Sequence, residues 1–165
     1  MIQKSKSVVT EGSPAEYVGG PVLIIEARFY EDIADELAAG AIAELEAHGV
    51  AFERISVPGA LEIPQALAAA APLFDDEVYA GAIALGCVIR GETTHYETVC
   101  HNANHWLMDV AINSMIPVGN AILTVETREQ ALERARGGRT GKGGDAARAC
   151  LKLIAIQHGF AGQLA

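Results

Sequence analysis

The residues best suited to chemistry lie between Gly86 and Tyr96, in the run Gly-Cys-Val-Ile-Arg-Gly-Glu-Thr-Thr-His-Tyr. We predict a glycine-containing turn that leads into a helix, with His95 in the first helical turn. Backbone N–H groups at a helix N-terminus have no partners inside the helix and favour an anion. Histidine exchanges protons readily near neutral pH. A single histidine in a helix is usually structural, but its place beside an anion-binding turn favours a general base.

Two earlier segments are predicted to lie at the same edge of the protein. Phe29 follows a short apolar run, and its ring is suited either to stacking on a flat heterocycle or to covering the start of a helix. Pro58-Gly59 predicts a rigid turn into a helix, where the backbone N–H groups near Ala60 and Leu61 are open to a ligand oxygen. Glu62 is equally suited to accepting hydrogen bonds from ligand hydroxyls and to balancing the helix dipole.

The charge balance limits the kinds of partner. The chain of 165 residues has a net charge of −9, which argues against a nucleic-acid or anionic-membrane surface because both need a basic patch. An anionic substrate must then be bound by a few local cations, and the candidates are Arg90, Arg134, Arg139 and Lys142. Arg134 is suited to binding a phosphate through two hydrogen bonds, although a solvated arginine near a helix C-terminus is the alternative.

Signals for metal and nucleotide sites are weak. His101 and His105 are four residues apart on a predicted helix, but no third ligand accompanies them, so we expect no metal. The segment around Lys142 departs from the P-loop pattern, and no Gly-x-Gly-x-x-Gly follows the first predicted strand. The sequence therefore gives no support to a mononucleotide or dinucleotide site.

The cysteines indicate a reducing compartment. Cys87, Cys100 and Cys150 are odd in number and include no Cys-x-x-Cys pair, so we expect no disulfide framework. Cys87 and Cys100 are expected to be small packing residues. No apolar run reaches the length of a membrane span, and the N-terminus lacks the apolar stretch of a signal peptide. We therefore expect a cytoplasmic protein.

Strand and helix patterns alternate from residue 21 onward. Apolar runs predict strands at residues 22–25, 50–57, 78–85 and 117–125. Helical spacing predicts helices from 33 to a stop at Gly49, over 61–71, from 94 past 110, over 127–136 and from 145 to about 158. In the third helix we place five apolar residues on one face: Val99, Ala103, Trp106, Leu107 and Val110.

Local signals refine the helix ends. Thr94 with Glu97, and Thr127 with Gln130, each fit a capping box. Residues 141–144 are rich in glycine and predict a flexible link, after which Asp145 caps the last helix.

This alternation predicts an α/β protein, a three-layer α/β/α sandwich with a four-stranded parallel sheet. Ligands in such sheets bind beyond the carboxyl ends of the strands, which is where the residues above are expected to lie. Residues 1–20 are polar and predict a flexible N-terminal arm, with strand addition to a neighbouring subunit as the alternative. Residues 21–165 predict a single α/β domain.

Taken together, the motifs resemble those of the 6,7-dimethyl-8-ribityllumazine synthase (lumazine synthase) family of riboflavin biosynthesis. The matching segments occur in the family's order and spacing over about residues 21–160. They are Ala27-Arg28-Phe29, Val57-Pro58-Gly59-Ala60-Leu61-Glu62-Ile63-Pro64, the segment 86–96, Leu123-Thr124 with Glu129-Gln130-Ala131 and Arg134, and Lys142-Gly143 before Ala146-Ala147.

The resemblance implies a flavodoxin-like, oligomeric protein and a transferase. The family condenses 5-amino-6-(D-ribitylamino)uracil with 3,4-dihydroxy-2-butanone 4-phosphate. The products are 6,7-dimethyl-8-ribityllumazine, phosphate and water, and neither a metal nor an organic cofactor takes part.

The resemblance also implies a role for each site residue. The pyrimidine ring stacks on Phe29, and its edge and ribityl chain are held by Ala60, Leu61 and Glu62. Backbone N–H groups of Gly91, Glu92 and Thr93 bind the phosphate, His95 moves protons, and Arg134 binds the phosphate as the second catalytic residue. The remaining substrate-binding positions are Val88, Ile89, Arg90, Asn120 and Lys142.

Two positions depart from the family pattern and bear on ring binding. Tyr30 stands where the family often has asparagine, and Asn120 where it often has a phenylalanine supplied by the neighbouring subunit. The resemblance implies a homopentamer with sites between subunits, in which Asn120, Arg134 and Lys142 come from the next subunit; some members form icosahedral capsids. A homologue that binds lumazine or flavin without turnover, or one kept for its shell, is the alternative.

Overall fold

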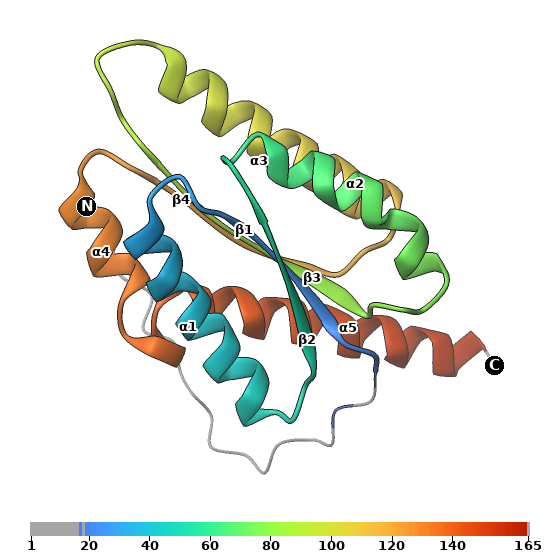
Figure 1. Cartoon of the computed structure of the whole chain (residues 1–165). Coiled ribbons are helices and arrows are strands. Elements are labelled where there is room, and N and C mark those ends of the chain that lie inside the picture. The colour runs from blue at the N-terminus through green and yellow to red at the C-terminus, as the bar shows by residue number, and fades with distance from the viewer. Residues whose placement is uncertain (1–16, 18, 165) are drawn as a thin grey trace.

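Four parallel strands form one sheet in the order β2-β1-β3-β4 (Figure 1). The computed structural model describes Tyr17 and residues 19–164. In chain order the elements are β1 (Val22–Ala27), α1 (Glu31–Ala47), β2 (Phe52–Val57), α2 (Glu62–Asp75), β3 (Gly81–Ile89), α3 (His95–Asn113), β4 (Val118–Val125), α4 (Arg128–Ala135), the 3-10 helix η1 (Gly138–Thr140) and α5 (Lys142–Leu164). Because all the strands are parallel, their carboxyl ends meet at one edge.

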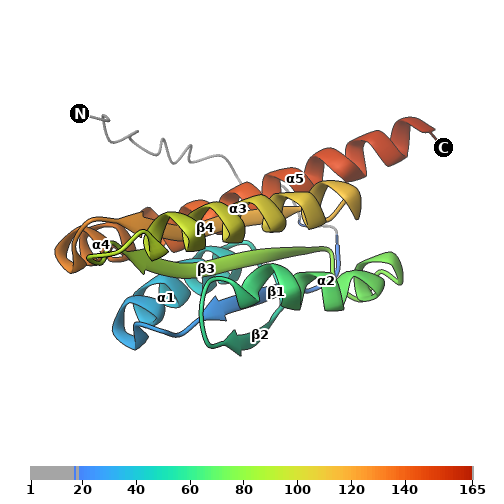
Figure 2. The same ribbon diagram turned by 90° about the horizontal axis from the view of Figure 1, so that it is seen from above.

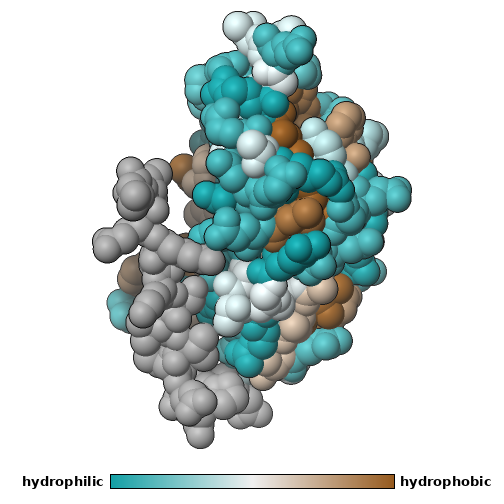
Figure 3. Space-filling view, turned by 90° about the vertical axis from the view of Figure 1, so that its left-hand side faces the viewer, coloured by the Kyte–Doolittle hydropathy of each residue, from teal (hydrophilic) through white to brown (hydrophobic). Residues whose placement is uncertain are grey.

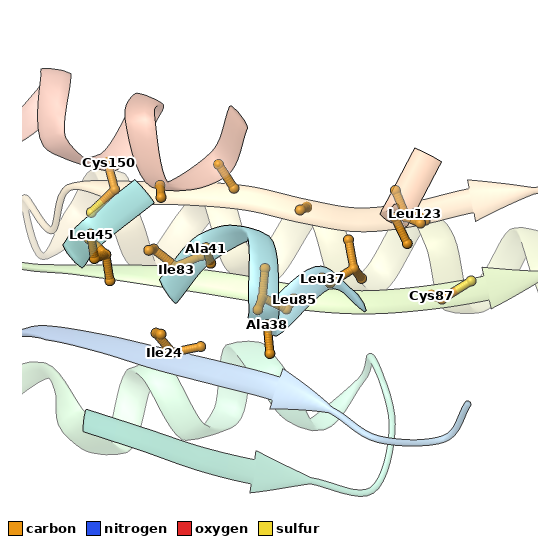
Figure 4. Close-up of a cluster of buried hydrophobic side chains, with 14 of the residues drawn as sticks. Ile24, Leu37, Ala38, Ala41, Leu45, Ile83, Leu85, Cys87, Leu123 and Cys150 are labelled. Carbon is orange, nitrogen blue, oxygen red and sulfur yellow. The ribbon is translucent and has the colours of Figure 1, made fainter. Parts of the chain in front are cut away.

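Helices cover both faces of the sheet, which confirms the predicted three-layer α/β/α sandwich. The helices α2 and α3 lie on one face, and α1, α4 and α5 lie on the other (Figures 1 and 2). One cluster of fully buried side chains, with Ile24, Leu37 and Ile83, fills the space between α1, α5 and the sheet (Figure 4). A second cluster on the opposite face includes Ile63 of α2 and Leu107 of α3.

The strands at the centre of the sheet explain the apolar runs in the sequence. Every residue of β1 is buried, as are the first seven of β3, because helices cover both faces. The edge strand β2 differs, since its four middle residues are exposed. The apolar run therefore predicts the central strands best.

The strand β3 begins later than the sequence predicts. It starts at Gly81 rather than at residue 78, because residues 76–80 close the end of α2. The N–H group of Val78 donates to the carbonyl of Leu73 at 2.8 Å. A valine-tyrosine pair that is typical of a strand therefore belongs to a turn.

The same strand also ends later than predicted. Residues 86–89 pair with the end of β4 and are strand rather than turn. The loop is confined to residues 90–94, and α3 begins at His95, as expected. The predicted turn is thus shorter, but it still opens the helix that carries the histidine.

The segment 141–144 is not a flexible link, because α5 begins at Lys142. Gly143 and Gly144 are buried in the first turns of α5, where this helix lies close to α1. A β-carbon on Gly143 would overlap the carbonyl oxygen of Leu37 and lie 2.8 Å from its carbonyl carbon. These glycines are required by close helix packing rather than by flexibility.

The last helix is also longer than predicted. Asp145 lies inside α5 and is not its cap, and its carboxylate is 3.2 Å from the Lys142 ammonium and 2.5 Å from the Arg148 guanidinium. The helix continues to Leu164 instead of ending near residue 158.

Only one of the two predicted capping boxes places its threonine as a helix cap. The Thr127 hydroxyl accepts a hydrogen bond from the N–H of Gln130 at 3.2 Å, and the Gln130 side chain accepts one from the N–H of Glu126 at 2.9 Å. Thr94 makes no side-chain cap, because its backbone is already close to helical at φ −71° and ψ 1°. Glu97 pairs with an arginine instead of the backbone.

Trp106 does not lie on the buried face of α3, although the sequence groups it with four other apolar residues on one face. Its side chain is 52% exposed and faces a surface groove between α2 and α3. The buried residues of α3 are Val99, Cys100, Ala103, Leu107 and Ala111. Helical spacing identifies Val99, Ala103 and Leu107 correctly, but it does not separate Trp106 from them because the four lie on neighbouring parts of one helix surface.

Glu44 of α1 is a buried carboxylate that two arginines bind. The guanidinium of Arg139 lies 2.7 Å from it and that of Arg148 lies 3.0 Å from it. Arg139, one of the candidate cations for an anionic ligand, therefore holds η1 against α1, and Arg148 does the same for α5.

Glu26 of β1 is a second buried carboxylate, with its side chain 3% exposed. It accepts hydrogen bonds from Arg54 at 2.8 and 3.0 Å and from Arg28 at 2.6 Å. Burial acts to raise the pKa of Glu26, but the hydrogen bonds and charges of the two arginines outweigh it and lower that pKa. The carboxylate is therefore ionised in the folded protein.

We expect Glu26 to make stability sensitive to acid. Because its pKa is lower in the folded chain than in the unfolded chain, its contribution is present above the unfolded pKa of about 4.3 and is lost as the pH falls through the folded pKa. Glu26→Gln should lower the free energy of unfolding at neutral pH by about 1–3 kcal/mol and should flatten the loss in acid. Urea unfolding of the wild type and of Glu26→Gln at about pH 7 and pH 3 checks this. If both proteins lost the same free energy of unfolding between the two pH values, the prediction would be wrong.

The predicted N-terminal arm lies largely outside the described residues. Of residues 1–20, only Tyr17, Gly19 and Gly20 are described. The Tyr17 hydroxyl donates to the Gly20 carbonyl at 2.9 Å, and its ring packs against the first buried cluster. The flexible arm and the alternative of strand addition to a neighbouring subunit both stay predictions.

Candidate active site

A cavity of about 400 Å³ opens at the carboxyl ends of the strands. Figure 3 shows this side of the molecule, where small hydrophobic areas lie among hydrophilic ones. Nine residues predicted to form the site line the cavity: Phe29, Ala60, Leu61, Glu62, Val88, Ile89, Gly91, Thr93 and His95. Topology brings together segments that are far apart in the sequence.

Phe29 provides an exposed aromatic surface at the cavity. It follows β1, and its side chain is 71% exposed, so it does not cover the core. Its ring meets that of Tyr30 edge to face, with centroids 4.9 Å apart. Tyr30 is half-buried at the start of α1, and burial raises the pKa of its hydroxyl. Because most of Phe29 is exposed, its ring offers aromatic surface to a flat ligand.

The turn before α2 provides backbone donors. The N–H of Glu62 donates to the Gly59 carbonyl and that of Ile63 to the Ala60 carbonyl, each at 3.2 Å. The N–H groups of Ala60 and Leu61 have no acceptor among the described residues, as expected just before a helix. Glu62, in the first turn of α2, lies beside them on the cavity wall.

The loop before α3 provides a second set of backbone donors. Within the described chain, the N–H groups of residues 91–94 find no acceptor. The N–H of His95 donates to the Thr93 hydroxyl at 3.3 Å. The His95 side chain is exposed at the cavity. An anion on this loop would therefore meet several unpaired N–H groups, the positive end of α3 and an imidazole.

Cys87, Tyr96 and Val99 also line the cavity, although the sequence did not mark them as site residues. Val99 follows His95 by four residues, so helical spacing could have identified it. Tyr96 is adjacent to His95, and helical spacing gives no such signal for it. Burial raises the pKa of the Cys87 thiol to about 11, which leaves it protonated near neutral pH. The expectation that Cys87 is a packing residue rather than a nucleophile agrees with this.

Five predicted site residues do not line this cavity: Arg90, Glu92, Asn120, Arg134 and Lys142. Arg90 pairs with Glu97 and Glu126. Asn120 donates from its side-chain amide to Asn104 at 2.9 Å, and the Lys142 ammonium lies 3.2 Å from Asp145.

Arg134 is exposed on α4. One of its guanidinium nitrogens donates to the Gln130 carbonyl at 3.1 Å, and no carboxylate of the described residues lies within 4.0 Å of it. It is a cation without a counter-ion in the part of the chain that the structure covers.

Residue 17 and residues 19–164 give no support for a metal site or for a membrane-spanning helix. No three His, Cys, Asp or Glu side chains in that part of the chain approach closely enough to hold a metal ion. Among the same residues, no helix is both long and apolar enough to cross a membrane.

Comparison with known proteins identifies relatives over nearly the whole chain. The model of the 6,7-dimethyl-8-ribityllumazine synthase family matches residues 20–158. The chain is 50% identical to the 6,7-dimethyl-8-ribityllumazine synthase of Azorhizobium caulinodans, over 96% of this chain and 98% of that protein. It is 54% identical to that of Methylorubrum extorquens, over 85% of this chain and 82% of the other. This chain therefore belongs to the 6,7-dimethyl-8-ribityllumazine synthase family.

Proposed function

We propose that this chain condenses 5-amino-6-(D-ribitylamino)uracil with 3,4-dihydroxy-2-butanone 4-phosphate, as a transferase of riboflavin biosynthesis. The products are 6,7-dimethyl-8-ribityllumazine, phosphate and water. The observation that carries this proposal is one cavity lined both by an exposed aromatic ring and by a loop of unpaired N–H groups beside a histidine. The family's name and the relatives at about 50% identity support the same reaction.

The cavity suits two substrates of different chemistry. The pyrimidine would stack on Phe29, with its ring edge and ribityl hydroxyls against the N–H groups of Ala60 and Leu61 and the Glu62 carboxylate. The butanone phosphate would place its phosphate on the N–H groups of residues 91–93, with Val88 and Ile89 as the wall between the two. Holding an amine and a ketone side by side supplies much of the rate enhancement.

His95 suits the proton transfers of the condensation. The pyrimidine amine attacks the ketone carbon, and loss of water leaves an imine. Removal of a proton from the neighbouring hydroxyl-bearing carbon then lets the phosphate leave with the electron pair of its carbon–oxygen bond, which gives an enol. Transfer of the enol hydroxyl proton to the terminal carbon converts this enol to a ketone. The ribityl-bearing nitrogen closes the ring on the resulting ketone with loss of water. We assign to His95 the removal and return of protons in these steps.

The alternative function was a homologue that binds lumazine or flavin without turnover, or one kept for its shell. No contact in the described chain supports either form of it. With Tyr30 beside it, Phe29 is still 71% exposed. We expect no metal or organic cofactor, since an amine and a ketone condense without one. The cytoplasmic location stays a prediction.

The first test is a turnover assay. Both substrates are mixed with the protein, and lumazine fluorescence and released phosphate are followed together. A rate above that of the uncatalysed condensation, with equal amounts of both products, supports the proposal. A rate equal to the uncatalysed one would overturn it.

We also propose that the site is completed by a second copy of the chain in a homo-oligomer. Arg134 and Lys142 do not line the cavity of their own chain, and Arg134 has no counter-ion among the described residues. A guanidinium is suited to binding a phosphate through two hydrogen bonds, in addition to the backbone N–H groups. Arg134, Lys142 and Asn120 are therefore assigned to the cavity of the neighbouring subunit.

Sharing of the site predicts complementation between two defective variants. His95→Ala and Arg134→Ala should each be slow alone, but mixed oligomers should regain activity because some sites receive both intact residues. Random mixing in a closed ring should restore about a quarter of the sites. Activity is measured after co-expression and compared with that of separately made proteins mixed without exchange. If co-expressed oligomers that are verified to contain both variants gain no activity, His95 and Arg134 must act within one subunit.

A further inference from the structure

Arg90 connects three elements that surround the loop at residues 90–94. It follows β3 directly, and its backbone N–H donates to the Val125 carbonyl at 2.9 Å. Its side chain hydrogen bonds to Glu97 and, through Nε at 2.8 Å, to Glu126. Its guanidinium carbon lies 4.3 Å from the centroid of the Tyr96 ring. The side chain therefore has three partners and does not line the cavity.

Two of these partners lie in the first turn of α3, and the third follows β4. Tyr96 lines the cavity, and Glu97 lies in the first turn of α3, two residues after His95. Glu126 comes directly after β4, and its N–H donates to the Gln130 side chain of α4 at 2.9 Å. Arg90 thus fixes the start of α3 against the end of the neighbouring strand.

The loop itself has few constraints of its own. Its N–H groups at residues 91–94 have no acceptor in the described chain, and these residues are exposed. A β-carbon on Gly91 would meet nothing within 4 Å. The spacing of the N–H groups therefore depends on how firmly the two ends of the loop are held.

Arg90 also controls the charge next to the loop. Its hydrogen bond to Glu97 lowers the pKa of that carboxyl and keeps it ionised. The second oxygen of Glu97 is shielded from solvent and has no hydrogen-bond partner among the described residues. Without Arg90, an uncompensated carboxylate would stand at the helix end that is expected to receive an anion.

We propose that Arg90 is a positioning residue, which clamps Glu97 to Glu126 and so sets the loop geometry that accepts the substrate phosphate. This inference rests on the proposed function and deepens it. The phosphate is bound by backbone N–H groups of residues 91–93, and Arg90 acts on it only through the clamp.

Kinetics of Arg90→Met test the clamp against a general loss of structure. We expect the KM for the butanone phosphate to rise about tenfold, because small displacements of a binding loop are costly, while the KM for the pyrimidine changes less than about twofold. The unfolding midpoint should fall by only a few degrees, since exposed ion pairs contribute little to stability. Arg136→Met, which removes an equal charge from an arginine whose nearest carboxylate is 3.9 Å away, is the control. Equal rises in both KM values would overturn the proposal.

A double variant distinguishes the clamp from direct phosphate binding by Arg90. Glu97→Gln/Glu126→Gln keeps the arginine but releases it. The clamp predicts that this variant, like Arg90→Met, binds inorganic phosphate about tenfold more weakly than the wild type. If Arg90 contacted phosphate directly, its release would leave binding unchanged or strengthen it, and that result would overturn the proposal.

The probe is inorganic phosphate, titrated by phosphorus NMR in the absence of the other substrate. Arg90→Lys replaces Arg90→Met in this titration if Arg90→Met does not fold. Lysine keeps the charge but cannot bridge the carboxylates of Glu97 and Glu126. Its phosphate affinity should therefore lie between those of the wild type and Glu97→Gln/Glu126→Gln. This readout does not need turnover. A wild-type protein that binds phosphate but forms no lumazine would therefore count against the proposed function and still test the clamp.

Discussion

Replacing His95 with alanine is expected to slow turnover about a hundredfold without abolishing it. A positioned general base contributes typically 10²–10⁴-fold, and the lower end applies here because amines and ketones condense readily without an enzyme. A hundredfold corresponds to about 2.7 kcal/mol in the free energy of activation. The rate that remains should come from holding both substrates in one cavity.

The loss should appear in kcat more than in KM. The groups proposed to bind the substrates, Phe29 and the N–H groups at residues 60–61 and 91–93, are unchanged by this substitution. Steady-state kinetics with each substrate varied in turn measure the two parameters separately. Added imidazole should restore part of the rate, since it can occupy the space that the side chain leaves.

His101→Ala is the matched control for this experiment. His101 is exposed on the same helix and does not line the cavity, so its removal should leave kcat within about twofold and give no response to imidazole. Complete loss of turnover in a folded His95→Ala protein would show that proximity contributes little. An unchanged kcat would remove His95 from the mechanism.

The sequence predicts the layers of the fold because burial on both faces leaves a simple mark. The central strands β1 and β3 are apolar runs, and the helices between them show helical spacing. A chain in which such strands and helices alternate is compatible with few layer architectures. The same topology explains why Phe29, Glu62 and His95 can be assigned to one edge of the sheet from the sequence alone.

Element boundaries were less predictable, because they depend on contacts that are distant in the sequence. Val78 and Tyr79 favour a strand locally, yet the Val78 N–H is used by the Leu73 carbonyl at the end of α2. Thr94 and Glu97 have the spacing of a capping box, but Glu97 hydrogen bonds to Arg90 instead. In both cases a tertiary partner outweighs the local preference.

The direction of a charged side chain was the least predictable feature of the site. Arg90 lies in the matching motif, but its guanidinium faces Glu126, which is 36 residues away. Phe29, Ala60, Leu61 and Gly91 needed no such information, because their backbone positions at the strand ends already place them at the cavity. The positions assigned to a neighbouring subunit cannot be derived from one chain.

Gly143→Ala, at the contact of α5 with α1, is expected to lower stability strongly. The new β-carbon would overlap the Leu37 carbonyl oxygen and lie 3.1 Å from the Ala41 amide nitrogen. These are backbone atoms, so the two helices must separate, which also disturbs Gly40 where it faces η1. Overpacking usually costs 1–3 kcal/mol, and a clash with backbone on a second helix should cost about 3 kcal/mol or more.

Gly159→Ala is the matched control, with the opposite expected sign. Gly159 lies in the same helix and is exposed, and a β-carbon added there would meet no atom within 4 Å. Alanine there should raise the free energy of unfolding by about 0.5–1 kcal/mol, because glycine in a helix interior loses more conformational entropy on folding. Both variants are compared with the wild type by urea unfolding at one protein concentration, since assembly would make stability depend on concentration.

The pair of variants separates two explanations for the glycines at the start of α5. If Gly143 supplied flexibility to a link, alanine would change stability little or increase it, as at Gly159. If it permits close approach of α5 to α1, the two substitutions should differ by about 4 kcal/mol in their effect on unfolding. The second outcome would have a functional consequence as well. Lys142 directly precedes Gly143, so separation of the helices should displace a cation proposed for the neighbouring site and lower activity even in the fraction that remains folded.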